Sequence, residues 1–285
     1  MAFNYQTLKN LTNAALADAT VDSGDFATGA ITSSKIADNT LSGTQLAAGA
    51  VDVTSSVASG ALPLTKGGTG STAVGGAYQA LTVNSSNNAF TFAPVGIRGM
   101  SVFTGGGTWT KPAGVRYVYV QVQGGGGGGS GHGESGAAGG YAEEIIDVTG
   151  VSSVSVSVSG ESGGTYYSNA GGNGGGSSFG PYVSASGGHG ANRHNQHNGG
   201  LPGIGSGGNL NIYGGAGGSH EQRSSGMGGS SFWGGPAPAG HPQGGHFAHN
   251  HQGHSAPGTG GTSGYFSGHR GSNGRPGLVV ITEFY

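Results

Sequence analysis

A glycine-rich stretch from Gly124 to Gly277 constrains this chain more than any other feature. It opens with six consecutive glycines, Gly124–Gly129, and holds 51 of the 67 glycines and all 11 histidines of the 285-residue chain. Ordering a backbone costs about 1–2 kcal/mol per residue, and glycine loses the most freedom. The stretch is therefore either a flexible linker or a structure in which glycine lets backbones pack together with no side chains between them.

Strand-like segments at both ends favour the folded interpretation. Apolar residues alternate over residues 115–122 before the six-glycine run, and residues 278–284 read as a closing strand. Valine and serine alternate over residues 153–158, inside the stretch. Aromatic residues also interrupt the glycines, which is not typical of linkers. Residues 98–285 are therefore predicted to form an all-β domain whose strands frame a polyglycine-II-like arrangement.

Details of this domain can also be predicted. Residues 101–104 and 108–111 flank three glycines and predict a hairpin. Among the aromatic residues, Phe179, Tyr182 and Tyr213 are interpreted as small cores buried between layers of glycine.

Composition excludes several classes of protein. Only 8 % of the residues are charged, and the formal net charge is −2. This charge gives no basic footprint for nucleic acid. The chain has no cysteine, so disulfides are excluded. Residues 1–10 lack the features of a signal peptide, and no apolar run reaches membrane-spanning length. We expect synthesis in a cytosol and no insertion into a membrane.

The N-terminal part carries a repeat of a different kind. Residues 1–25 show only a weak helical pattern and are interpreted as an attachment segment. From residue 26 an apolar residue recurs every five positions, at Phe26, Ile31, Ile36, Leu41, Leu46 and Val51. This period fits neither a helix nor a strand. Several identical chains could bury such a row around a common axis, so residues 26–66 are predicted to form the intertwined shaft of a homotrimer, followed by a connecting region at 67–97.

Several motifs carry a resemblance to a known class of protein. The run Gly29–Val51 resembles the repeats of bacteriophage tail fibres, and Leu62–Thr72, with the sequence LPLTKGGTGST, resembles a short motif common in phage tail-fibre and tail-collar proteins. Three further runs are similar to a glycine-rich domain at the ends of phage fibres: Gly107–Val115, Val118–Gly129 and Gly139–Tyr141.

The resemblance implies an elongated, trimeric virion protein assembled in the host cytoplasm. Its N-terminus would bind a tail adaptor or a baseplate or nozzle protein. Its C-terminal domain would be an adhesin tip that binds a host polysaccharide or outer-membrane protein without covalent chemistry. Two alternatives stay open: a structural tail component without host contact and, less favoured, a depolymerase that cleaves glycans.

The carboxylates do not indicate an enzyme. Glu143 and Glu144 are adjacent, so in a strand they face opposite ways, whereas glycan cleavage needs two carboxylates a few ångströms apart. Glu134 and Glu221 remain as a distant pair. No Gly-x-Ser-x-Gly elbow lies between a strand and a helix. No catalytic residue is predicted.

Receptor contacts are expected on loops that emerge at one end of the packed glycine segments. Aromatic, imidazole and guanidinium groups on these loops suit sugar rings and protein loops alike. The candidate receptor-binding residues are Arg193, His194, His197, Phe232, Trp233, His246, Phe247, His249, His251, His254, Tyr265 and Phe266.

Two of these histidines allow a second interpretation. His249 and His251 share a face if the chain is extended, and one such pair from each of three chains would supply six nitrogens around an axial metal, as in phage fibre tips that this sequence resembles. Imidazole suits iron, zinc, copper or nickel. The alternative is that these histidines are exposed polar groups in a recognition loop. No other cofactor is predicted.

Overall fold

The computed structural model describes residues 28, 32–36, 69, 75–84, 86–167, 169–192, 199–219, 226–236, 255–264 and 269–285. The chain divides into two compact units, Met1–Thr72 and Ala73–Tyr285. In the first unit, the described residues include a 3-10 helix at Ser33–Lys35. The predicted attachment segment, and the predicted shaft apart from residues 28 and 32–36, lie outside the described residues.

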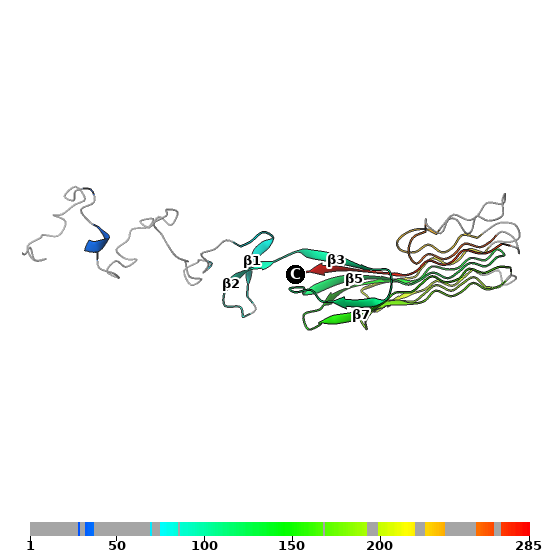
Figure 1. Cartoon of the computed structure of the whole chain (residues 1–285), viewed down its shortest axis with the longest axis horizontal. Helices are drawn as coiled ribbons and strands as arrows, with labels where there is room; N and C mark the ends of the chain where they lie inside the picture. The colour runs from blue at the N-terminus through cyan, green and yellow to red at the C-terminus, as the bar shows by residue number, and fades with distance from the viewer. Residues whose placement is uncertain are drawn as a thin grey trace, which may run out of the picture. The chain divides into compact units, whose positions relative to one another are not determined.

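The second unit is built from β-strands and extended glycine segments (Figure 1). Its strands are β1 (Gln79–Val83), β2 (Phe90–Pro94), β3 (Ile97–Phe103), β4 (Gly107–Thr110), β5 (Tyr117–Gln123), β6 (Tyr141–Asp147), β7 (Ser153–Ser157), β8 (Ser177–Phe179), β9 (Val183–Ala185), β10 (Gly205–Ser206), β11 (Leu210–Ile212) and β12 (Leu278–Phe284).

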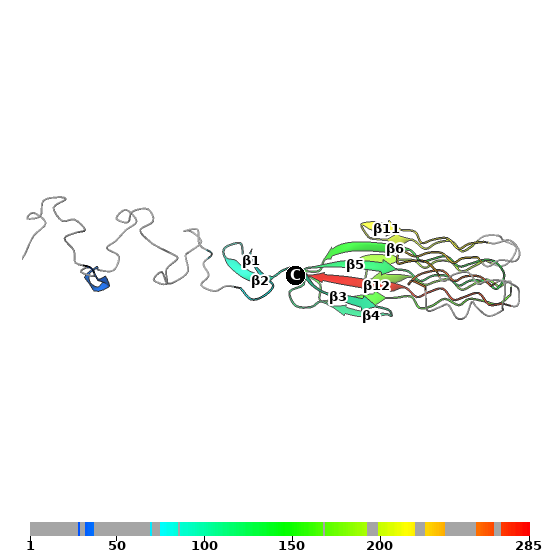
Figure 2. The ribbon, with the colours of Figure 1, turned by 90° about the horizontal axis from the view of Figure 1, so that it is seen from above.

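The strands form three antiparallel sheets. β1 pairs with β2. One five-stranded sheet has the order β10-β9-β8-β7-β4, and the other has the order β11-β6-β5-β12-β3, which Figure 2 shows with its strands side by side. The predicted all-β class is confirmed for the described residues, as are the predicted strands that correspond to β5, β7 and β12.

The predicted hairpin of residues 101–104 and 108–111 is wrong. β3 pairs with β12, whereas β4 pairs with β7 in the other sheet. The reason is Trp109, which is 2 % exposed and lies in the core between the sheets. Its indole Nε1 donates to Glu283 Oε1 at 2.9 Å, and its ring meets Phe179 edge to face at 5.7 Å. Burial of this side chain carries β4 across to the second sheet.

The hydrophobic core fills the space between the two five-stranded sheets. Alternating residues of β5 point into it, which explains the valine pattern over 115–122. The buried members of this cluster are Trp109, Val115, Val118, Val120, Val122, Ala142, Ile146, Val148, Val154, Val156, Phe179, Val183, Ala185, Val279 and Ile281. The prediction of buried aromatic residues holds for Phe179 and for Tyr182, which packs against the cluster, but Tyr213 is 66 % exposed.

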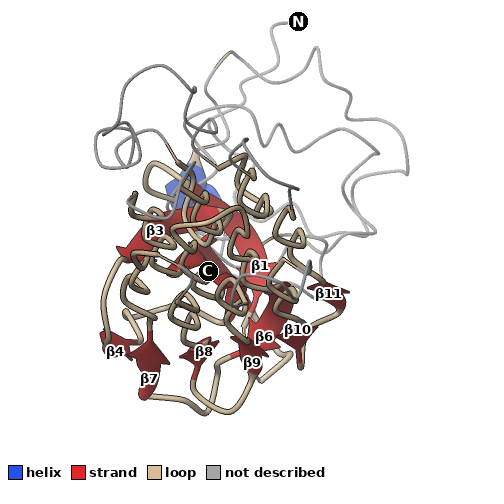
Figure 3. Ribbon diagram, turned by 90° about the vertical axis from the view of Figure 1, so that its right-hand side faces the viewer, coloured by secondary structure: helices blue, strands red, loops and turns tan. Residues whose placement is uncertain are grey.

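Beyond the sandwich that the two five-stranded sheets form, the chain continues as extended segments whose backbones hydrogen-bond to one another. Successive N–H groups of Gly124–Gly129 donate in turn to residues 137–140, 172–175 and 272–275, with N···O distances of 2.8–3.0 Å. Every third residue therefore faces the same neighbour. Three residues per turn with no bonds inside the segment is the geometry of polyproline II and polyglycine II. Figure 3 shows these segments end-on as small coils.

We call these packed extended segments the glycine layer. Glycine is required in it because the backbones of neighbouring segments touch. A Cβ atom on Gly127 would lie 2.1 Å from the carbonyl oxygen of His189, and one on Gly126 would lie 1.9 Å from that of Thr259. Real Cβ contacts are never so short. The predicted packing of backbone against backbone is therefore present, and it explains the six-glycine run.

The junction between sandwich and glycine layer is held by Gln123, the last residue of β5. This side chain is fully buried, and its Nε2 donates to the carbonyl oxygens of Gly139 and Gly140, both at 2.9 Å. The strand pair of β5 and β6 continues without interruption, because Gly124 N donates to Gly140 O at 2.9 Å. The sheets thus set the register of the glycine segments.

Gly127→Ala is expected to lower the free energy of unfolding by about 3 kcal/mol or more, because its Cβ collides with backbone atoms that cannot move aside. Gly163→Ala is the matched control, since a Cβ there meets no atom within 4 Å. That variant should stay within about 0.5 kcal/mol of the parent. Denaturant unfolding of the full chain measures both, and equal losses would contradict the packing described.

Candidate functional site at the distal end of the glycine layer

The glycine segments have two ends. One end joins the strands, and the other, here called the distal end, consists of turns. The turn Ser130–Ser135 belongs to the distal end and hydrogen-bonds to several other segments. Gly264 N donates to the carbonyl oxygen of Ser130 at 2.8 Å, Ser135 N donates to that of Gly218 at 3.0 Å, and Gly200 N donates to that of Ser135 at 2.9 Å. One turn thus joins three other segments through backbone bonds.

These bonds place the flanks of three further segments together, and two of these segments contain candidate receptor-binding residues. Residues 193–198, 220–225 and 265–268 lie outside the described residues, but each is flanked by a segment that bonds to Ser130–Ser135. The flanks of these three segments therefore lie together at the distal end, whereas Gly258, which follows the undescribed residues 237–254, lies against Gln123 at the sheet end.

The described side chains displayed at the distal end include two tyrosines. Tyr166 and Tyr167 are 48 % and 60 % exposed, with ring centroids 6.4 Å apart. The guanidinium of Arg270 lies 5.8 Å from the ring centroid of Tyr166, within cation-π range. Arg270 Nε also donates to the carbonyl oxygen of Gly164 at 3.0 Å, which fixes the side chain on the scaffold. Two aromatic faces and a held cation are therefore presented together.

Sequence reasoning missed Tyr166 and Tyr167. The two tyrosines are adjacent in the turn between Gly164 and Gly171, at the distal end. Tyr167 has a φ of 55°, a left-handed conformation that marks a turn. Consecutive tyrosines followed by Ser168 and Asn169 between glycines were the available signal.

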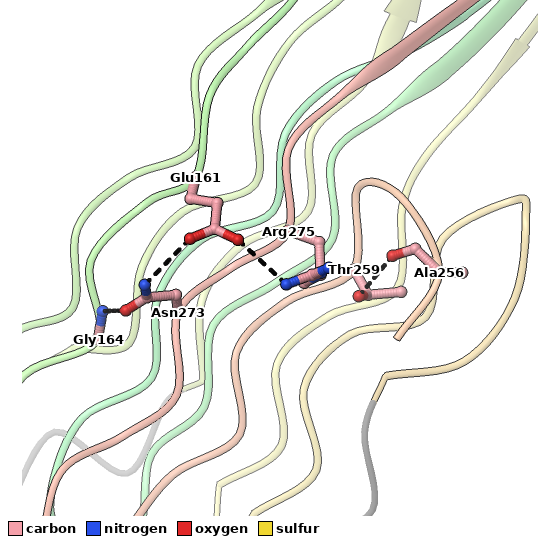
Figure 4. A network of polar contacts seen from close by, with 6 residues as sticks. All are labelled: Glu161, Gly164, Ala256, Thr259, Asn273 and Arg275. Atoms are coloured by element: carbon pink, nitrogen blue, oxygen red, sulfur yellow. Dashed lines mark hydrogen bonds and ion pairs between the residues drawn. The ribbon is translucent and has the colours of Figure 1, made fainter. Parts of the chain in front are cut away.

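Side chains brace the glycine segments that lead to this end (Figure 4). Asn273 Oδ1 accepts from the backbone N of Gly164 at 2.9 Å, and its Nδ2 donates to Glu161 at 3.3 Å. Arg275 Nη1 forms an ion pair with Glu161 at 3.0 Å. Both charged groups are partly exposed, so the pair adds little stability, whereas the asparagine replaces a backbone bond between segments.

Phe232 and Trp233 lie at the end of the glycine layer that joins the strands, not at the distal end. The other candidate residues lie outside the described residues, so their sharing one end stays a prediction. Phe232 stacks on Tyr141 of β6, with centroids 3.8 Å apart and planes 12° apart, and Trp233 stands at 90° to Phe232. Tyr141 is only 1 % exposed as a result. Phe232 covers Tyr141 by stacking on it, while Phe232 and Trp233 themselves stay 49 % and 38 % exposed.

Tyr141 is also held by polar groups. Gln121 Nε2 donates to its hydroxyl, and the hydroxyl donates to Glu143 Oε2, both at 2.6 Å. Burial, together with this hydrogen bond to a carboxylate, raises the pKa of Tyr141 well above its ordinary value of 10.0. The folded protein therefore favours the neutral phenol.

The carboxylates are arranged as the sequence predicts. Glu143 accepts from Tyr119 and Tyr141 on one face of β6, whereas Glu144 accepts from the backbone N of Asn209. They do not flank a common space. Glu134 is 2 % exposed and accepts from Ser130 Oγ at 3.3 Å, and Glu221 lies outside the described residues.

The other candidate residues lie outside the described part of the chain: Arg193, His194, His197, His246, Phe247, His249, His251, His254, Tyr265 and Phe266. Among described residues, no group of three or more His, Cys, Asp or Glu could hold a metal ion. The described residues also contain no helix with the length and apolar character needed to cross a membrane.

Phe232→Ala is expected to lower the free energy of unfolding by about 1–2 kcal/mol, because Tyr141 loses its stacking partner. Cell binding should not change, since this cluster is remote from the distal end. Thermal unfolding and a binding assay on the same preparation test both statements. A folded variant that loses binding would return Phe232 to the receptor site.

Alkaline pH should weaken the fold through Tyr141. A raised folded-state pKa contributes stability that is present below the usual tyrosine pKa of about 10 and is lost as pH rises beyond it. The free energy of unfolding, measured from pH 8 to 11, should fall less steeply in Tyr141→Phe than in the parent. Identical slopes would show that Tyr141 titrates normally.

Comparison with known families gives one match. A family model described as a glycine-rich domain matches residues 101–283, from within β3 to within β12. The matched region spans the sandwich, the glycine layer and the distal end. A search of the curated proteins gave no match.

Proposed function

The chain belongs to the glycine-rich domain family. From the resemblance of its sequence to phage fibres, we propose that it is a phage tail fibre protein whose C-terminal domain attaches the virion to the host cell surface. The attachment is non-covalent. The receptor is a surface polysaccharide or a loop of an outer-membrane protein.

One observation carries the proposal: a braced scaffold ends in displayed aromatic and cationic side chains. The distal end presents Tyr166, Tyr167 and Arg270 on segments that are held by backbone hydrogen bonds to their neighbours. A rigid scaffold with exposed side chains on its turns is what recognition requires, because little freedom is lost when the ligand binds.

The chemistry of these groups fits the two receptor classes. Tyrosine combines a flat apolar face with a hydroxyl, so it can stack on a sugar ring and hydrogen-bond to it. Arginine donates to sugar hydroxyls, acidic sugars or backbone carbonyls. Stacking and hydrogen bonding suffice for recognition, so the proposed activity is binding, with no bond broken.

The rest of the chain fits the same proposal. Residues 1–25 bind a tail adaptor or a baseplate or nozzle protein, and residues 26–66 intertwine in a homotrimer. Three weak distal sites per fibre, and several fibres per virion, then give strong attachment by avidity. The protein is located in the virion tail after assembly in the host cytoplasm.

The proposal predicts that distal substitutions weaken attachment without unfolding the protein. Tyr167→Ala and Arg270→Ala should each reduce binding of the labelled full chain to susceptible cells by about tenfold, because each removes one recognition group worth 1–2 kcal/mol per site. Flow cytometry over a concentration series measures the change. Circular dichroism checks the fold.

Tyr213→Ala is the matched control. Tyr213 is also an exposed tyrosine, at 66 %, but it follows β11 at the sheet end. It should bind as the parent does. Periodate treatment of the cells destroys a glycan receptor, and protease treatment destroys a protein receptor. The treatment that abolishes binding therefore identifies the chemical class of the receptor. A folded parent that binds neither susceptible nor resistant cells would overturn host attachment and favour a structural role in the tail.

A further inference from the structure

An apolar surface that the receptor proposal does not use lies on β3 and β12. The outer face of this sheet is the face that points away from the core. On β3 it carries Ile97, Met100 and Val102, which are 68 %, 64 % and 56 % exposed. In a monomer such a row would face water along the whole strand. Contiguous exposed apolar surface marks an interaction site.

The register places a second row beside it on β12, where Val280 is only 6 % exposed and Thr282 and Phe284 are half-buried, so the exposed part of the surface is on β3. Val102 pairs with Val280, Met100 pairs with Thr282, and Ile97 pairs with Phe284. Paired residues of neighbouring antiparallel strands share a face. We call this set of side chains the β3–β12 face. Five of these six side chains are apolar, and the sixth is a threonine.

No charge interrupts this face. The charged residues of the two strands, Arg98 and Glu283, bond to each other at 2.8 Å, and Glu283 is 3 % exposed on the core side. The other half of the same sheet differs, because polar groups occupy its outer face. Tyr119 donates directly to Glu143, and Gln121 donates to Tyr141, which donates to Glu143. The polar side chains of β5 and β6 therefore limit the apolar face to β3 and β12.

The place where the chain enters the sandwich favours a second copy as the occupant. β3 is the first strand of the sandwich, and it follows the predicted shaft through residues 67–96. Copies that associate along the shaft would bring their β3 strands to a high effective concentration. An uncharged apolar face matches another copy of itself, because neither partner buries an unpaired charge.

We propose that the β3–β12 faces of the copies in one fibre pack together around the common axis, an inference that rests on the proposed homotrimer. The sandwiches then form the base of the tip. The distal ends, at the far side of the glycine layers, stay free for the receptor.

Single cysteines test this arrangement, because the chain has none of its own. Met100→Cys in the full chain, treated with a short bis-maleimide, should give crosslinked chains on a denaturing gel. Ile145→Cys is the matched control, since Ile145 is 61 % exposed on the outer face of the same sheet but on β6. Crosslinking of the control should be about tenfold weaker at the same concentration.

A second pair of variants tests the packing itself. Met100→Glu with Val102→Glu should lower the temperature at which the oligomer dissociates, followed by light scattering, whereas Ile145→Glu should not. Both positions are exposed, so circular dichroism is expected to report a native fold. Crosslinking that is equal at the two cysteines, or a dissociation temperature unchanged by the glutamates, would overturn the proposal.

Light scattering measures the oligomeric state, and the cell-binding assay measures attachment, so the two proposals are tested separately. A parent that scatters as a monomer of 27.6 kDa would overturn both the interface and the homotrimer, whatever the cell-binding result. A trimer that crosslinks through Met100→Cys but does not bind cells would support the interface and overturn only host attachment.

Discussion

Direct contact between backbones is the interaction on which the rest of this domain depends. The glycine segments have no side-chain core of their own, and their N–H and carbonyl groups bond to neighbours on three sides. Because these groups are buried, each must find a partner, or a desolvation cost of about 1–3 kcal/mol follows. Removing the side chains is what lets every segment reach three neighbours at once.

The β-sandwich solves a problem that the glycine layer cannot solve alone. Segments without side chains have little to distinguish one register from another, so they could slide. The sheets carry side chains, and burial of Val118, Val120 and Val122 fixes β5 in one register. That register passes into the glycine layer through Gln123 and the bond between Gly124 and Gly140. The hydrophobic core therefore positions turns that it does not contact.

Local patterns in the sequence predicted the strands, and long-range packing decided what the patterns missed. The closing strand was predicted over 278–284, which is β12, because a period of two needs only neighbouring residues. The hairpin prediction failed because Trp109 joins a core built by residues far along the chain. Tyr166 and Tyr167 were missed for the same reason, since only the assembled layer places their turn beside Arg270. Composition alone suggested polyglycine packing, but not which segments are neighbours.

The three-residue repeat restricts how such a domain can change length. Each turn of a segment rises about 9 Å, since three residues advance about 3.1 Å each. Inserting three residues into a segment keeps all three bonding directions in phase, whereas inserting one or two rotates every later N–H toward the wrong neighbour. Lengthening one segment also demands an equal change in those around it. Insertions and deletions are therefore tolerated mainly in the turns, where the chain has left the lattice of backbone bonds.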